Sequence, residues 1–247
     1  MCVTLEVCLE GIDSALAAQE GGAQRIELCA GLVEGGTTPS HGTMLQARKK
    51  LDLEINAIIR PRGGDSCYSG DEFAVMQEDI CCAREIGLDG VVIGVLTPDG
   101  LIDRDRTAAL VDLARPLSVT FHRAFDHIPD PFAALEVLVE LGVDRVLTSG
   151  LKSTVPEGLE LITKLNKVAA GQVIVMPGSG IDISNVQDIV RSSGVREVHI
   201  GSGAAEWVPE RSQVRNPEVP LSASNQGTLR RTSAAKVREL VDLLNKL

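Results

Sequence analysis

The sequence has few aromatic residues, and this scarcity excludes one class of binding surface. One Tyr, one Trp and four Phe occur in 247 residues, which is too few for a platform on which bases or sugar rings could stack. Basic side chains are also outnumbered, 24 against 34 acidic ones, so the formal net charge is −10. We therefore expect no nucleic-acid or anionic-membrane partner, although a local basic pocket is compatible with this charge.

Long apolar runs and paired cysteines are missing as well. No run approaches the ~20 residues that span a bilayer, and no basic segment precedes the first apolar run as it would in a secretory signal. The six cysteines form no C-x-x-C pair and no zinc pattern. The sequence thus favours a cytosolic, or else nuclear, protein whose cysteines are thiols.

What the sequence does contain is a series of short apolar runs, recurring about every 28 residues. They are rich in Val and Ile, as strands of a parallel sheet buried on both faces are. The runs are Val3 to Cys8, Arg25 to Cys29, Glu54 to Arg60, Gly90 to Val95, Ser118 to His122, Arg145 to Thr148, Val173 to Met176 and Glu197 to Ile200. Helical stretches with start signals separate several of them. These are 15–19 after Asp13-Ser14, 44–49 after Pro39-Ser40, 133–141 after Asp130-Pro131, and 186–191 after Asp182.

Strand followed by helix, eight times over, predicts a single (β/α)8 TIM barrel of parallel strands over residues 1–247. An open doubly wound sheet is the alternative, but residues 8–13 lack the glycine fingerprint that usually follows its first strand. One segment departs from this regular alternation of strands and helices. We expect residues 206–233 to form a long loop before the last helix, 234–247, and to lie over the mouth of the barrel. Trp207 would pack under this loop, at the mouth or on a partner subunit.

The first two strands repeat one pattern, apolar-Glu-apolar-Cys, which ends at Cys8 and again at Cys29. Strand alternation places Glu6, Cys8, Glu27 and Cys29 on one face. Because a Glu against the helix layer would be a costly buried charge, this face should point into the barrel. Thiols at matching heights on neighbouring strands could then share one ion. Two thiolates suit a linear Cu(I) site, whereas the simpler interpretation is two small core thiols.

Strand three leads into Arg60 and Arg62, which bring two guanidinium groups to the carboxyl end of the barrel. Arg60 could pair with Glu27, keeping that carboxylate ionised at neutral pH, or with an anionic ligand. Strand five ends at His122, with Asp126 following on the same rim. A His at the carboxyl end of a barrel strand is a candidate for acid–base work.

The remaining histidines, His41, His127 and His199, are weaker candidates, because each lies on a loop or within a strand without evident partners. Glycine-rich turns follow strands seven and eight, where such barrels bind phosphate through backbone amides. Tight steric turns would need the same glycines. The candidate anion-binding residues are Arg62, Gly178, Ser179, Gly180, Gly201 and Ser202.

Several stretches resemble the CutC copper-homeostasis family. They are RIELC (25–29), EGGTTPS (34–40), RPRGGD (60–65), TFHRAFD (120–126), RVLTSG (145–150) and MPGSGI (176–181), within a resemblance that covers about residues 5–204. The resemblance implies a (β/α)8 barrel, a cytosolic role in copper tolerance or trafficking, and a dimer or tetramer. Cys8 and Cys29 stand where eukaryotic-type members carry their candidate Cu(I) ligands.

Two hypotheses of different class follow. In the first, the protein binds a copper ion through Cys8 and Cys29, with Cys67 as a candidate third thiolate and the neighbouring glutamates in support. In the second, it is an enzyme acting on a small phosphorylated or carboxylated metabolite. Arg60 would then hold the substrate, and Glu27 or His122 would move a proton.

Overall fold

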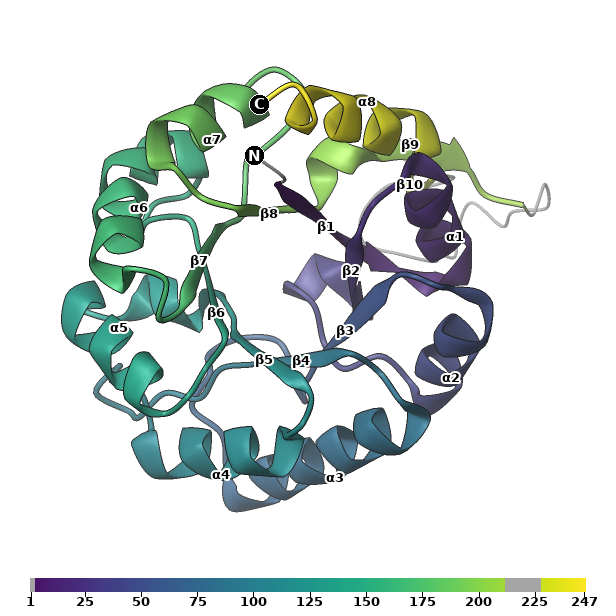
Figure 1. The fold of residues 1–247 in the computed structure, drawn as a ribbon. Coiled ribbons are helices and arrows are strands. Elements are labelled where there is room, and N and C mark those ends of the chain that lie inside the picture. Colours follow the sequence, from purple (N-terminus) through teal and green to yellow (C-terminus); the bar gives the residue numbers. More distant parts are fainter. Residues whose placement is uncertain (1–2, 212–227) are drawn as a thin grey trace, which may run out of the picture.

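The structure, a computed structural model, describes residues 3–211 and 228–247. Its centre is one sheet of eight strands in the order β7-β6-β5-β4-β3-β2-β1-β8, surrounded by helices (Figure 1). The strands are β1 Thr4–Glu10, β2 Arg25–Cys29, β3 Glu54–Ile58, β4 Gly90–Ile93, β5 Ser118–Phe121, β6 Arg145–Thr148, β7 Ile174–Pro177 and β8 Glu197–Ile200. All of them coincide with the predicted apolar runs to within two residues at either end.

The sheet closes on itself. β1 pairs in parallel with both β2 and β8, while β7 and β8 meet through a single parallel bridge between Gly178 and His199. These contacts confirm the (β/α)8 barrel and exclude the open doubly wound sheet, in which the edge strands would stay apart.

Helices follow the strands as predicted. They are α1 Gly11–Gly21, α2 His41–Lys50, α3 Gly70–Ile86, α4 Arg104–Ala114, α5 Pro131–Glu140, α6 Val155–Ala169, α7 Val186–Ser193 and α8 Ala234–Leu244. The expected caps form at Ser40, which accepts from the amide of Thr43, and at Asp130, which accepts from the first amides of α5. The first helix begins earlier than expected, at Gly11. None of the helices in the described ranges is long and apolar enough to cross a membrane.

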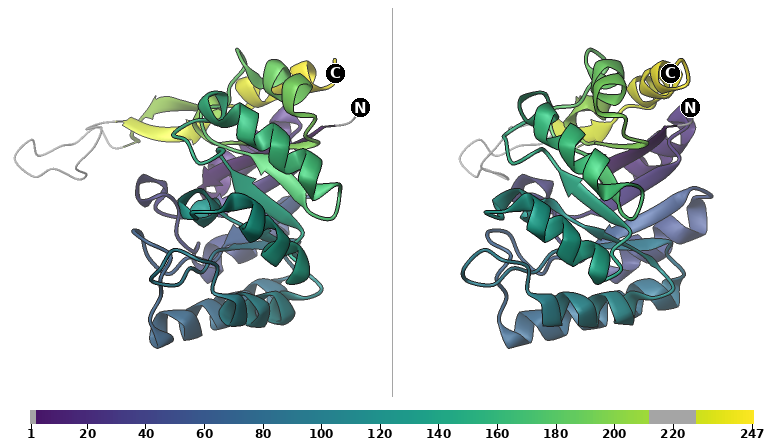
Figure 2. Two further views of the ribbon diagram at one scale, coloured as in Figure 1. Left: turned by 90° about the vertical axis from the view of Figure 1, so that its left-hand side faces the viewer. Right: turned by 60° about the vertical axis from the view of Figure 1, so that its left-hand side comes forward.

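The segment after β8 differs from the expected loop. A 3-10 turn, η3 (Ser202–Ala204), leads into an antiparallel hairpin of β9 (Ala205–Pro209) and β10 (Thr228–Thr232). Arg231 and Arg211 pair with Asp13 of α1, so the hairpin lies beside the first helix and extends away from the barrel (Figure 2). Trp207 is 57% exposed rather than packed beneath this segment. The rest of the predicted loop, 212–227, lies outside the described residues.

The two faces of the first strands separate as predicted. Leu5, Val7, Ile26 and Leu28 belong to the main core shared with the helices, whereas Cys29 belongs to a separate small cluster inside the barrel, against which Cys8 packs. Alternation thus directs the polar residues of β1 and β2 inward.

Charged side chains fill the barrel interior below the mouth. Arg25, only 2% exposed, donates to Glu6 at 2.5 Å and also to Glu197. Arg145 reaches Glu197 from the other side at 2.7 Å. Burial alone would raise the pKa of Glu6, but the charge of Arg25 and the bond to His199 outweigh it and lower that pKa to about 2. Each buried carboxylate in this layer therefore has a cationic partner, as burial requires.

We expect Arg25→Met to destabilise the protein by about 3–5 kcal/mol, because it leaves Glu6 and Glu197 buried without their shared cation. Urea unfolding measures this cost. The matched control is Arg104→Met, which breaks an ion pair between Arg104 and Glu140 that is more than half exposed and should change the free energy of unfolding by less than about 1 kcal/mol. Equal effects of the two substitutions would contradict the role given to Arg25.

Candidate functional site

A cavity of about 620 Å³ opens at the carboxyl ends of the barrel strands. Its walls bring together residues that are far apart in the sequence. Cys8, Glu27, Arg60, His122 and His199 all line it. The first four were predicted as site residues, and their meeting agrees with the expectation that strand ends gather at one mouth.

The two cysteine sulfur atoms lie close together, although the residues are not at matching heights on their strands as expected. Cys8 lies opposite Glu27 on the neighbouring strand, and Cys29 lies opposite Glu10, so the cysteines differ in height by one two-residue step. Both still point to the same interior, and their Sγ atoms are 3.7 Å apart. Cys8 is half-buried and lines the cavity, whereas Cys29 is fully buried and does not line the cavity.

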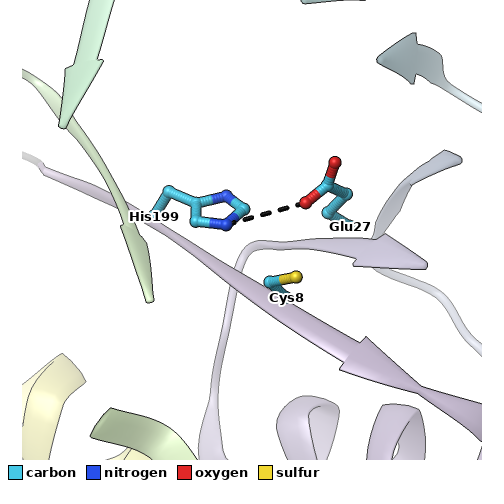
Figure 3. Close-up of side chains that lie close together, drawn as sticks. All are labelled: Cys8, Glu27 and His199. Atoms are coloured by element: carbon cyan, nitrogen blue, oxygen red, sulfur yellow. Dashed lines mark ion pairs between the residues drawn. The ribbon is translucent and has the colours of Figure 1, made fainter. Parts of the chain in front are cut away.

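His199 is a candidate site residue to which the sequence analysis gave little weight. Its Nδ1 lies 2.7 Å from Glu6 Oε1. On the other side of the ring, Nε2 points toward Glu27 (Figure 3) and lies 3.6 Å from Glu27 Oε2. Possible ligand atoms of Cys8, Glu27 and His199 all lie within 4.8 Å of one another. The sequence offered no evident partners for His199, and the structure provides two, Glu6 and Glu27. Closure of the barrel supplies them, because β8 pairs with β1 and places His199 opposite Glu6.

The sulfur pair holds its proton unequally. The contact with the Cys29 sulfur lowers the pKa of Cys8 well below its usual range, although burial acts in the opposite direction, and the contact with His199 adds to the lowering. The same sulfur contact, together with burial, raises the pKa of Cys29 well above its usual range. Cys8 is therefore the more acidic thiol of the pair and the one more readily deprotonated.

The pKa values of Glu27 and His199 both rise. Burial and the negative charge of Cys8 raise the pKa of Glu27 well above its ordinary value, a direction opposite to the expectation that this carboxylate stays ionised at neutral pH. Burial acts to lower the pKa of His199, but its bonds to Cys8 and Glu6 outweigh burial and raise it well above its usual value. The mouth thus brings together a thiol whose pKa is lowered with an imidazole and a carboxyl group whose pKa values are raised.

Arg60 lines the cavity but does not pair with Glu27. Its guanidinium donates to three backbone carbonyls in the loops after β2 and β3, each at 2.8 Å. The expected ion pair is therefore absent, and the cation that offsets the interior carboxylates is Arg25 with His199. Arg60 holds the loops that form one wall of the mouth.

His122 and Asp126 are both held by neighbouring backbone. The Nδ1 of His122 accepts from the amide of Ala124, so Nε2 carries the proton, and it has no partner among the described residues. Burial and the charge of Arg60 lower the pKa of His122 to about 3, which leaves the ring neutral at pH 7. Asp126 accepts from Thr148 and from the amides of Ser149 and Leu151. The acid–base roles of both residues stay predictions.

The glycine-rich turns after β7 and β8 line a second, smaller cavity of about 190 Å³. Five of the six predicted anion-binding residues meet there, namely Gly178, Ser179, Gly180, Gly201 and Ser202. Arg62 does not join them. It is 38% exposed and pairs with Asp65 and Glu72 on the loop before α3 and its first turn.

Comparison with known proteins gives one consistent family. The model of the CutC family matches residues 3–204. Over 239 residues the sequence is 47% identical to the copper homeostasis protein cutC homolog of Mus musculus, covering 96% of this chain and 87% of that protein. A CutC family protein of Chromobacterium violaceum is 46% identical over 244 residues, 98% of each chain. The crystal structure of a CutC protein from Streptococcus agalactiae superposes with a TM-score of 0.77 at 33% identity, covering 80% of this chain and 98% of that one.

The low pKa of Cys8 predicts unusual reactivity. Iodoacetamide should alkylate Cys8 at pH 6.5 nearly as fast as at pH 8.5, because its thiolate is already formed at the lower pH. An ordinary free thiol reacts roughly tenfold more slowly for each pH unit below about 8.5. Peptide mapping by mass spectrometry measures the rate at Cys8, and His199→Gln should shift its onset to higher pH. A rate that rises through pH 8.5 in the unaltered protein, as for a free thiol, would refute the thiolate assignment.

Proposed function

The chain belongs to the CutC family, and on this premise we propose that it acts in copper homeostasis by binding a Cu(I) ion, its cargo, through Cys8 and Cys29. The observation that carries the proposal is the 3.7 Å separation of the two sulfurs at an open cavity. Thiolates are the soft ligands that Cu(I) selects. Two relatives at nearly half identity carry the words copper homeostasis in their names, which agrees with this choice of metal.

The sulfur separation favours a bent site over the predicted linear one. With metal–sulfur bonds of about 2.3 Å, the length that zinc makes with thiolate, a linear arrangement would hold the sulfurs about 4.6 Å apart. At 3.7 Å the same bonds subtend an angle close to that of a tetrahedron, which leaves room for a third ligand. We assign His199 Nε2 to this position because its ring shares with Cys8 a cluster of possible ligand atoms within 4.8 Å of one another, whose third member is Glu27 rather than Cys29.

The surroundings of His199 match those of a metal-binding imidazole. Ligating histidines usually donate their other ring nitrogen to a carboxylate, which fixes the tautomer and orients the ring. Glu6 supplies that carboxylate at 2.7 Å from Nδ1. Cys67, the expected candidate for a third thiolate, is not among the described residues that line either cavity. We therefore assign the third ligand position to His199.

Metal binding at this site should release protons from its ligands. Cys8 is poised as a thiolate, but Cys29 and His199 hold protons in the metal-free protein, and a metal would displace both. Copper affinity should therefore fall as the pH is lowered. The site needs reduced thiols, as a cytosolic location provides. The expected dimer or tetramer stays a prediction.

Titration of the reduced protein with Cu(I) against a competing chelator tests the proposal. We expect one equivalent to bind tightly, and Cys8→Ser with Cys29→Ser to weaken binding by at least roughly 100-fold because both soft ligands are lost. His199→Gln should cost roughly 10- to 100-fold. Cys67→Ser is the matched control and should bind like the unaltered protein. Wild-type affinity in the double variant would eliminate the thiolate site.

A further inference from the structure

We propose that the smaller cavity, between the turns after β7 and β8, binds the phosphate group of a small phosphorylated metabolite through Arg123 and Arg230. This inference goes beyond copper binding. It replaces the predicted Arg62 with two arginines that the fold brings to the cavity from the loop after β5 and from the hairpin strand β10.

The cavity lies at the weakest seam of the barrel. Neighbouring strands elsewhere in the sheet pair along ladders of two or more residues, whereas β7 and β8 share only the bridge between Gly178 and His199. The turns that leave these two strands diverge beyond the bridge, and the cavity of about 190 Å³ lies between them. Such turns present backbone amides to an anion when no side chain blocks the approach.

Gly201 keeps that approach open. A Cβ on Gly178 would overlap Leu147 at 2.6 Å, so packing alone explains that glycine. A Cβ on Gly201 would instead meet nothing nearer than Cys8 Cβ at 3.8 Å and Arg230 Nη2 at 3.9 Å. Its φ of −104° is open to other residues. The glycine at this position therefore leaves free volume directly in front of the Arg230 guanidinium.

The charged side chains around this volume are both positive, and of the two only Arg123 has a carboxylate partner, Asp126. Arg230 is exposed and has neither an ion pair nor a hydrogen bond with any described residue. Arg123 uses Nε on Asp126 and Nη2 on Ser149, both at 2.8 Å, and its Nη1 has no described partner. No carboxylate is among the described residues that line the cavity. Two guanidinium groups facing one small cavity are suited to bind phosphate oxygens.

The cavity also shows what kind of molecule would carry the phosphate. It shares Cys8, Arg123 and His199 with the larger cavity of about 620 Å³. A phosphate held at the β7 and β8 turns would therefore have its organic part over Cys8 and His199, inside the larger cavity. The class of ligand that fits is a phosphate monoester of a short polar metabolite rather than free phosphate alone.

Calorimetric titration of the reduced, copper-free protein tests this inference, with inorganic phosphate and glycerol 3-phosphate as probes at constant ionic strength set by chloride. We expect saturable binding of both, with the ester the tighter. Arg230→Gln should weaken each by at least roughly tenfold, because a charge-assisted hydrogen bond is lost. Arg231→Gln is the matched control on the same strand, since Arg231 pairs with Asp13, and it should bind like the unaltered protein.

Two further variants separate a loss of phosphate binding from a loss of folding and from a loss of copper binding. Gly201→Ala should weaken phosphate binding without changing charge, with an unchanged circular dichroism spectrum. Cys29→Ser, at a residue that lines neither cavity, should retain phosphate binding even where copper binding is lost. Absence of saturable phosphate binding in the unaltered protein, or unchanged affinity in Arg230→Gln, would overturn the phosphate site and leave the copper proposal standing. Binding of phosphate without the ester would overturn the assignment to a metabolite.

Discussion

The carboxylate of Glu6, held between Arg25 and His199, is the interaction on which the rest of the site depends. Glu6 binds the Arg25 guanidinium with one oxygen and His199 Nδ1 with the other. Buried charges are tolerated only when they are paired in this way. The pairing also fixes the His199 ring, so that Nε2 faces Glu27 and Cys8. A charged layer that stabilises the barrel thereby orients the group that acts at its mouth.

The mouth above this layer has two chemically different sides. β1 and β2 supply soft, partly deprotonated sulfur, whereas the turns after β7 and β8 supply backbone amides and two guanidinium groups. Cys8 and His199 belong to both sides, because barrel closure makes β8 the neighbour of β1. One opening therefore places the proposed metal ligands, Cys8 and His199, beside the cavity that we propose for an anion. This arrangement unites the two functional hypotheses that the sequence left open.

Much of this could be predicted from the sequence, and the exceptions have physical causes. Short apolar runs identified every barrel strand, and the repeated Glu and Cys pattern identified Cys8 and Cys29, because alternation within a strand is a local property. His199 could not be identified locally, since its partners come from a strand nearly 200 residues away. Arg60 was misjudged because a guanidinium binds carbonyls as readily as carboxylates. The hairpin strands β9 and β10 were missed because their exposed, mixed sequence has no apolar run.

X-ray absorption spectroscopy of the Cu(I)-loaded protein tests the central claim most directly, since it counts the atoms bound to the metal. The account predicts two sulfur neighbours and one nitrogen, with the nitrogen lost in His199→Gln. A spectrum with only nitrogen and oxygen neighbours, or one that His199→Gln leaves unchanged, would contradict the claim that the layer below the mouth positions His199 for the metal.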